Sequence, residues 1–343
     1  MKNFLKKFNY TGKTFHVTEK YKIWFTLPAV MLGIGIICFI IFAIIGGSFS
    51  SGFNLGIDFT GGTILSVELG QMAEGELYKT NAAKIEEVVS SKGMNIGYTQ
   101  VSGTGLQAAI VLKYQGNVSE EEMKGINTEI SNEIKALYPE ISEANETFVS
   151  MEYIGATASK DLIGKAFLSI FITGIAMLLY IILRFEIYSG LTAVIALMHD
   201  VLIIIAFVIV TRIQLNSNFI AVIITIISYS INNTIVIFDR VRENLVITPV
   251  SNRISYSDIV NKSITETIGR SVNTTITTML TITVLAVMSV PVIREFSLMI
   301  IVGLVAGTFS SLCIAPTIYS LVRDRRYQKT NASKYTATQA KKA

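Results

Sequence analysis

The sequence predicts an α-helical polytopic membrane protein with six transmembrane helices and one α+β domain outside the membrane. Of its 343 residues, 51% are hydrophobic and 16% are charged, which is too apolar for an ordinary soluble chain. Several windows of about 20 apolar residues are long enough to cross a hydrocarbon core roughly 30 Å thick. After the first window, residues 47–162 break the apolar pattern and are too long for a structureless loop, so we expect a folded domain there.

The predicted transmembrane helices are residues 24–46, 163–183, 190–211, 217–239, 272–290 and 297–321. A basic N-terminus, residues 1–23, precedes the first span, and no small-x-small cleavage pattern follows it, so we expect an anchor rather than a cleaved signal. Lys and Arg are concentrated in residues 1–23, in the loop 240–271 and in the tail 322–343. The positive-inside rule therefore predicts that both termini are cytoplasmic and that residues 47–162 lie on the other side of the membrane.

The outer segment has the pattern of strand, helix, strand, strand, helix, strand. Alternating or continuous apolar runs predict strands at 63–69, 95–101, 107–114 and 147–154. Helical spacing predicts helices over 78–91 and 120–138, the second of them opened by Ser119 with Glu122 three residues later. This order is that of a ferredoxin-like βαββαβ domain, a fold that hosts many unrelated functions and identifies none.

The stretch GIDFTGGT, residues 56–63, has the most unusual chemistry of the outer segment. Asp58 lies between apolar residues, and the pair Gly61 and Gly62 leads into the first predicted strand. Glycine pairs relieve steric conflict where φ is positive or where two backbones approach closely, and this is the favoured interpretation. A ligand-binding nest is the alternative, although no phosphate-loop lysine follows the glycines.

His199 and Asp200 lie near the middle of the third predicted span. A charged side chain at the bilayer centre costs about 2.5–3.5 kcal/mol on insertion scales, so this pair requires an explanation. Neighbouring residues point about 100° apart on a helix, so we expect each side chain to find its partner on another helix rather than in its neighbour. Hydrogen bonds that pack helices together and an ion relay are both compatible with the pattern.

Two further spans carry polar residues at helical spacing. In the fourth span these are Thr225, Tyr229, Asn232, Asn233 and, seven residues after Asn232, Asp239. In the fifth span a polar stripe begins at the cytoplasmic end and consists of Arg270, Thr274, Thr277 and Thr281. We expect the two polar faces to meet, keep their hydrogen-bonding groups away from lipid and hold a file of water with Arg270 at its mouth. Simple polar packing between helices is the alternative.

Several function classes lack their signatures in this sequence. It contains no GxxxxGK[ST] nucleotide loop, no His/Cys metal constellation and no nucleophile-base pair outside the membrane, so we expect no cofactor, no metal and no enzymatic reaction. The formal net charge of +4 is accounted for by the cytoplasmic flanks, so it gives no reason to expect a nucleic-acid partner. Any work by the protein would draw on a transmembrane ion gradient.

Five motifs follow one another between about residue 50 and residue 322. They are GIDFTGGT after the first span, HD in the third, SYSINNTIVIFDRVREN in and after the fourth, GRSVNTTITT entering the fifth, and FSLMIIVGLVAGTFSS in the sixth. Together they resemble the SecF family, whose members belong to the bacterial SecD–SecF protein-export complex and to the resistance-nodulation-division superfamily. The resemblance implies the six-span topology, the ferredoxin-like outer domain, a membrane domain paired pseudo-symmetrically with SecD, and a place in the bacterial cytoplasmic membrane.

The same resemblance implies a function and a set of partners. The complex is held to use the proton-motive force, or sodium in some members, to help a preprotein move through and leave the SecYEG channel after the SecA ATPase has pushed it. Auxiliary membrane proteins of the YidC and YajC type would be further partners. Half of an ion-driven drug or lipid efflux transporter is the alternative from another class, and a scaffold without ion coupling is a third.

This chain departs from the family at one position. Family members commonly have Asn-Asp-Thr in the fourth span, and the acid is thought to take part in proton transfer, whereas this chain has Asn232-Asn233-Thr234. An Asn side chain neither gains nor loses a proton near neutral pH, so Asn233 can only position water or a neighbour. Arg270 matches the membrane Arg of the family. We therefore expect this span to form one wall of an ion path whose titrating acid lies mainly on SecD.

Overall fold

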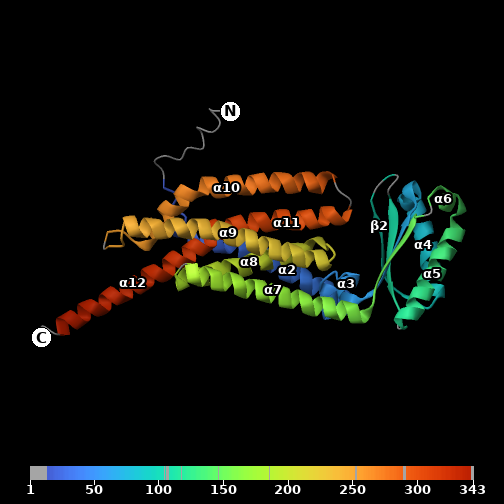
Figure 1. The fold of residues 1–343 in the computed structure, drawn as a ribbon, viewed down its shortest axis with the longest axis horizontal. Coiled ribbons are helices and arrows are strands. Elements are labelled where there is room, and N and C mark those ends of the chain that lie inside the picture. The colour runs from blue at the N-terminus through green and yellow to red at the C-terminus, as the bar shows by residue number, and fades with distance from the viewer. Residues whose placement is uncertain are drawn as a thin grey trace, which may run out of the picture.

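The computed structural model describes residues 14–340, apart from 104, 106, 107, 117, 146, 185, 252, 289 and 290. Long helices lie side by side in an elongated bundle, and a small sheet domain lies at one end of it (Figure 1). At the other end, the C-terminal helix α12 leaves the bundle and points away from it. The molecule is therefore mostly helical, with its strands confined to one end.

The bundle is built from helices with the bounds α2 Tyr21–Ile45, α7 Ala156–Arg184, α8 Ile187–Thr211, α9 Ser217–Ile247, α10 Tyr256–Met288, α11 Pro291–Phe309 and α12 Ala315–Ala340. A π-helical turn, Ser310–Ile314, joins α11 to α12.

Within the described residues, five helices are long and apolar enough to cross a membrane: Thr18–Ile45, Ala156–Arg184, Ile187–Thr211, Ser217–Ile247 and Ile293–Lys329. They overlap five of the six predicted spans. The remaining predicted span, 272–290, overlaps α10, which is not among these five, so the count of six spans stays a prediction.

Two helices continue well past the predicted membrane boundary. Helix α9 ends at Ile247 and α10 begins at Tyr256, so most of the predicted loop 240–271 is helical. Arg240 stabilises this extension by bonding Glu243 on its own helix and Glu266 on α10, each at 2.6 Å. Hydropathy locates the apolar part of a helix, and charged pairs of this kind let the helix continue beyond it.

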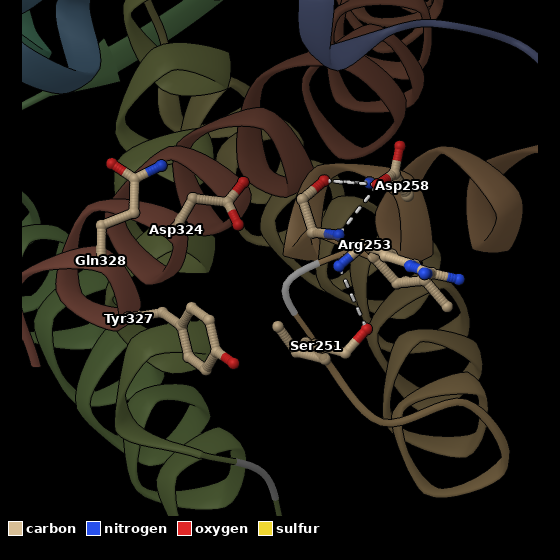
Figure 2. Close-up of a pocket in the computed structure, with 9 residues that line it drawn as sticks. Ser251, Arg253, Asp258, Asp324, Tyr327 and Gln328 are labelled. Atoms are coloured by element: carbon tan, nitrogen blue, oxygen red, sulfur yellow. Dashed lines mark hydrogen bonds between the residues drawn. The ribbon is translucent and has the colours of Figure 1, made fainter. Parts of the chain in front are cut away.

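Asp324 joins the tail helix α12 to the start of α10. Its carboxylate accepts hydrogen bonds from the backbone N–H of Tyr256 at 2.8 Å and from Ser257 Oγ at 2.7 Å. The first amides of a helix have no partner within the helix and favour negative charge, so this contact fixes where α12 meets α10. Figure 2 shows Asp324, Tyr327 and Gln328 facing the turn before α10 across a pocket of about 480 Å³.

The segment between α2 and α7, which the sequence predicts to lie outside the membrane and which we call the outer domain, has four strands and four α-helices in its described residues. The first of these helices, α3 Ile57–Thr60, precedes β1. The bounds are β1 Gly62–Glu68, α4 Gly75–Ser91, β2 Asn95–Ser102, β3 Ala109–Gln115, α5 Glu120–Leu137, α6 Pro139–Ala144 and β4 Val149–Ile154. The strands form one sheet in the order β2-β3-β1-β4, and all three pairings are antiparallel. Ser119 and Glu122 form the capping box that the sequence predicts at the start of α5.

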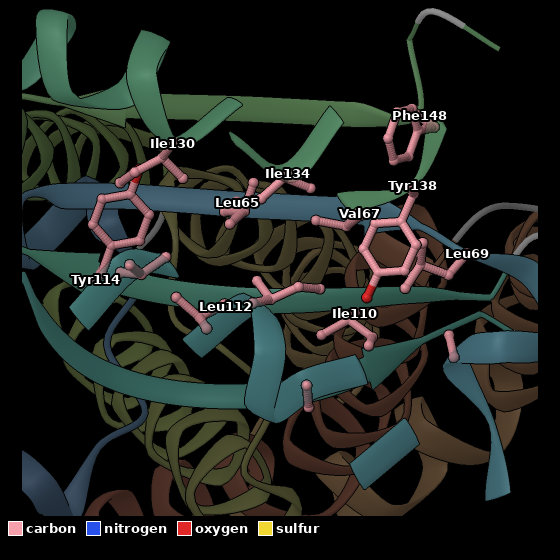
Figure 3. Packing of buried hydrophobic residues seen from close by; sticks show 14 of the residues in the cluster. Leu65, Val67, Leu69, Ile110, Leu112, Tyr114, Ile130, Ile134, Tyr138 and Phe148 are labelled. Carbon is pink, nitrogen blue, oxygen red and sulfur yellow. The ribbon is translucent and has the colours of Figure 1, made fainter. Parts of the chain in front are cut away.

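The core of the outer domain lies between the sheet and helices α4 and α5. Leu65 on β1 is paired with Leu112 on β3, and both are fully buried beneath Ile130 and Ile134 of α5 (Figure 3). Alternate residues of a strand point to opposite faces, so one face of β1 and β3 supplies this core. The other face of the sheet is turned toward the helical bundle (Figure 1).

Candidate functional site

Asp200, on α8, is the centre of a polar cluster inside the helical bundle. Its side chain is fully buried, and Oδ2 accepts hydrogen bonds from Ser230 Oγ on α9 at 2.5 Å and from Ser310 Oγ in the π-helical turn at 2.9 Å. His199 Nδ1 lies 3.0 Å from Asp200 Oδ1. A carboxylate buried among apolar helices is costly unless hydrogen bonds satisfy it, and three groups do so here.

The expectation that His199 and Asp200 do not face each other was wrong. The 3.0 Å contact between His199 Nδ1 and Asp200 Oδ1 shows that the polar atoms of the two neighbouring side chains meet. The prediction that Asp200 finds partners on other helices is confirmed by Ser230 and Ser310. Ser230 and Ser310 were not among the predicted site residues, because a single Ser in an apolar span gives no local signal, and their alignment with Asp200 depends on helix packing.

Two glycines of α11 allow this cluster to form. A Cβ on Gly303 would lie 2.4 Å from Ile226 Cγ1, and a Cβ on Gly307 would lie 3.1 Å from Ser230 Cβ. Helix α11 therefore lies close against α9. The π-helical turn that follows widens the helix locally at Ser310, and such turns are frequent at functional sites.

A second polar layer crosses α9, α10 and α11. Tyr229 Oη donates to Thr275 Oγ1 at 2.8 Å, and Thr275 Oγ1 lies 2.8 Å from Thr308 Oγ1. About one helical turn from this layer on α9 and α10, Asn233 Nδ2 and Ser271 Oγ are buried and have no hydrogen-bond partner in the described part of the chain. Two buried polar groups without a partner can each form a hydrogen bond to a buried water molecule.

Beyond Arg270, the polar stripe of α10 does not meet the polar face of α9 in the described part of the chain. Arg270, Thr274 and Thr277 are exposed, and the two threonine hydroxyls donate to carbonyls of their own helix. The face that α10 buries against its neighbours instead carries Ser263, Thr267, Ser271 and Thr275 at four-residue intervals. Small hydroxyl side chains allow close packing, whereas burying a charged Arg is costly unless an acid is paired with it.

Of the remaining candidate residues in the fourth span, two are buried inside the bundle and two are exposed on its surface. Asn233 and Thr234 are buried, whereas Asn232 and Asp239 are exposed. Asp239 Oδ1 lies 3.5 Å from Arg184 Nη2 on α7. A cavity of about 310 Å³ between α9 and α10 is lined by Val236, Asp239, Arg240, Glu243, Glu266, Thr267 and Arg270. The structure thus brings Arg270 and Asp239 to one exposed cavity.

The GIDFTGGT stretch forms the joint between the bundle and the outer domain. Asp58 Oδ2 accepts a hydrogen bond from the Ser217 backbone N–H at the start of α9, at 2.5 Å. Gly61 and Gly62 have φ values of 70° and 117°, and a Cβ on Gly62 would lie 2.8 Å from the Tyr114 carbonyl oxygen. Both conditions that favour glycine, a positive φ and a close approach of two backbones, are therefore present at this pair.

The second linker of the outer domain runs beside this joint. Ser159 Oγ, near the start of α7, donates to the Asp58 carbonyl oxygen at 2.7 Å, and a Cβ on Gly61 would lie 3.3 Å from Ala156 Cα. The chain therefore enters and leaves the outer domain at one packed point, which lies against the N-terminal ends of α7 and α9.

Comparisons with known proteins agree with this architecture. The family model of the protein export membrane protein SecD/SecF C-terminal region matches residues 133–325, and the SecD/SecF GG motif matches residues 46–71. The SecF protein translocase subunit of Rickettsia bellii is 31% identical over 277 residues, which cover 81% of this chain and 86% of the relative. The corresponding subunit of Calditerrivibrio nitroreducens is 30% identical over 308 residues, 90% of this chain and 93% of the relative.

A solved structure has the same arrangement of helices and strands. The crystal structure of SecDF, a translocon-associated membrane protein from Thermus thermophilus, superposes with a TM-score of 0.68 at 25% identity and covers 90% of this chain. The matched part is 38% of the SecDF chain, so the protein described here spans less than half of that relative. The family match over more than half of the sequence, together with the translocase relatives, shows that this multi-pass membrane chain belongs to the SecF family of protein-export membrane proteins.

Proposed function

We propose that this protein pairs with SecD and uses a transmembrane ion gradient, of protons or sodium, to promote preprotein translocation and release on the outer side of the cytoplasmic membrane. SecYEG, SecA and auxiliary proteins of the YidC and YajC type are the proposed further partners. The proposal includes six membrane spans, cytoplasmic termini and a ferredoxin-like outer domain. The antiparallel strand order β2-β3-β1-β4 supports the ferredoxin-like fold of that domain.

The observation that carries the ion-coupling part is the buried Asp200 cluster. Ionisable residues inside transmembrane bundles are rare because they are costly, and they mark ion pathways and relays. Asp200 lies inside α8 with hydroxyl donors from two other helices, so a change in its charge would alter contacts between all three. Ion binding and helix arrangement are thereby linked at one residue.

The exposed stripe of α10 supports a contribution from the partner. Arg270, Thr274 and Thr277 are exposed on α10, and an exposed Arg on a membrane helix can be paired by an acid on a neighbouring protein. In SecD such an acid would pair with Arg270 when ionised and release it when protonated. Because Asn233 cannot titrate, we place the mobile charge mainly on the partner acid rather than at the NNT motif.

The test replaces Arg270→Met and measures export of a secreted preprotein by pulse-chase, with and without the ion gradient. We expect the gradient-dependent part of export to be lost while SecD still co-purifies with the variant. Arg294→Met is the matched control, because Arg294 is an exposed Arg at the other end of the bundle. If Arg270→Met keeps full gradient-dependent export, the protein acts as a scaffold instead. If cells that carry the variant export preprotein normally but fail to remove drugs or lipids, the protein is part of an efflux transporter.

A further inference from the structure

A cavity of about 580 Å³ lies between the outer ends of the bundle helices and the sheet. Its walls come from the end of α2, the segment before β1, strands β2 and β3, and the end of α8. The lining residues are Phe42, Ile45, Gly46, Ser50, Ser51, Phe53, Asn54, Leu55, Thr60, Gly97, Thr99, Gln100, Lys113, Tyr114, Gln115 and Arg212. Because α2 and α8 are membrane-span candidates that end here, the cavity lies at the level of the lipid head groups.

The cavity contains two cations and no acid among its lining residues. Lys113 Nζ donates to the Leu55 carbonyl oxygen at 2.9 Å and to Thr60 Oγ1 at 2.8 Å, both neutral acceptors. Burial lowers the pKa of Lys113, because the ammonium group is partly removed from water without a carboxylate to compensate it. An anion that entered this cavity would supply the missing charge.

Arg212, the second cation, is held in an unusual backbone conformation. It ends α8 with φ of 56°, the only positive φ among the described non-glycine residues. Its guanidinium group lies 4.4 Å from the centre of the Phe42 ring and donates through Nη1 to the Ser51 and Gly52 carbonyl oxygens at 3.1 and 3.3 Å. A strained residue needs support from its surroundings, and here the support directs a positive charge into the cavity.

Exposed apolar side chains surround the cavity on the α2 side. Ile44, Ile45 and Phe49 are 74%, 77% and 77% exposed. Along the rest of α2 only Pro28 and Gly35 are buried, so the helix presents an apolar surface that extends from the cavity into the membrane. A ligand with an anionic head group and long apolar chains would match both the cationic cavity and the apolar surface of α2.

We propose that this cavity binds the phosphate of an anionic phospholipid from the outer leaflet, with Lys113 and Arg212 as its cationic ligands. The neutral donors Asn54 and Gln100 in the lining complete a polar pocket for the head group. The acyl chains lie along α2. Because the cavity is walled by both the bundle and the sheet, the bound lipid stabilises the outer domain in its position above the membrane. The proposal does not depend on ion coupling or on SecD.

The test measures lipid retention by native mass spectrometry of the intact protein, purified from bilayers of phosphatidylglycerol and phosphatidylcholine. We expect the protein to retain phosphatidylglycerol in preference, and Lys113→Gln and Arg212→Gln each to weaken retention about fivefold, the effect of one basic residue near an anionic surface. Lys79→Gln is the control with the same charge change, because Lys79 is exposed on α4, on the other side of the sheet. It should retain lipid as the unaltered protein does.

Three results would overturn the proposal. They are equal retention of the two lipids, equal losses in Lys79→Gln and Lys113→Gln, and displacement of the lipid by millimolar inorganic phosphate, which would assign the cavity to a free anion. The charge-conserving variants Lys113→Arg and Arg212→Lys separate binding from folding, since we expect both to keep the lipid. If they lose it as fully as the glutamine variants do, charge is not what the cavity recognises.

Discussion

Asp200 depends on two hydroxyl groups that reach it from different helices. A hydrogen bond to a charged group contributes about 1.5–3 kcal/mol, and its removal leaves a buried carboxylate undersatisfied. We therefore expect Ser310→Ala and Ser230→Ala each to lower the free energy of unfolding in detergent by about that amount. Ser228→Ala is the control, because Ser228 is exposed and donates to Ile224 of its own helix at 2.9 Å. Equal stability of all three variants would show that Asp200 does not rely on these donors.

Tyr114 makes the outer domain sensitive to high pH. Its ring is fully buried, its hydroxyl donates to Asn127 Oδ1 at 2.7 Å, and burial raises the pKa of Tyr114 to about 12. The phenol titrates near pH 10 in an unfolded chain, so its contribution to stability is complete below about pH 10 and is lost as the pH rises toward 12.

Urea unfolding at stepped pH, followed by circular dichroism, tests this. The free energy of unfolding should fall across that window, and it should fall less in Tyr114→Phe. Tyr78→Phe, which alters a partly buried tyrosine in the same domain, should keep the pH dependence of the unaltered protein. If Tyr114→Phe shows the same pH dependence of unfolding as the unaltered protein, Tyr114 is not the cause of that dependence.

At the scale of elements, the contact between α9 and α11 rests on glycine. A Cβ on Gly303 would lie 2.4 Å from Ile226 Cγ1, close to the branch point of that side chain, so α11 would have to move. Overpacking of this kind costs about 1–3 kcal/mol, and we expect Gly303→Ala to lower the unfolding temperature and weaken export. Gly174→Ala on α7 is the control, because no heavy atom lies within 4 Å of its added Cβ. Similar effects of the two changes would refute a role for close packing.

For the whole molecule, the joint at Asp58 is expected to transmit motion between the bundle and the outer domain. Asp58→Asn removes a charged acceptor from the start of α9, and we expect faster hydrogen exchange in residues 54–60 and 213–218 with no change in the sheet amides. The exposed Asp161 on α7 provides the control variant Asp161→Asn. Unchanged exchange at the joint, or faster exchange throughout the outer domain, would contradict a local coupling role.

The sequence by itself determined five of the six apolar spans, the order of the strands and of the two long helices in the outer domain, and the kinship with SecF. These follow from local patterns: windows of apolar residues, alternation along strands, and cap signals such as Ser119 with Glu122. It also located the conformational glycines Gly61 and Gly62, because glycine pairs have few other uses in such a place.

Only the tertiary structure decided how the helices are rotated and which polar groups meet. Helix α10 carries two polar stripes, one through Arg270 and Thr274 and one through Ser271 and Thr275, and periodicity gives no reason to bury one rather than the other. The choice follows from packing, since small hydroxyl residues fit against α9 whereas Arg270 is too costly to bury without an acid. The same dependence on packing brought Ser310 to Asp200 across 110 residues of sequence.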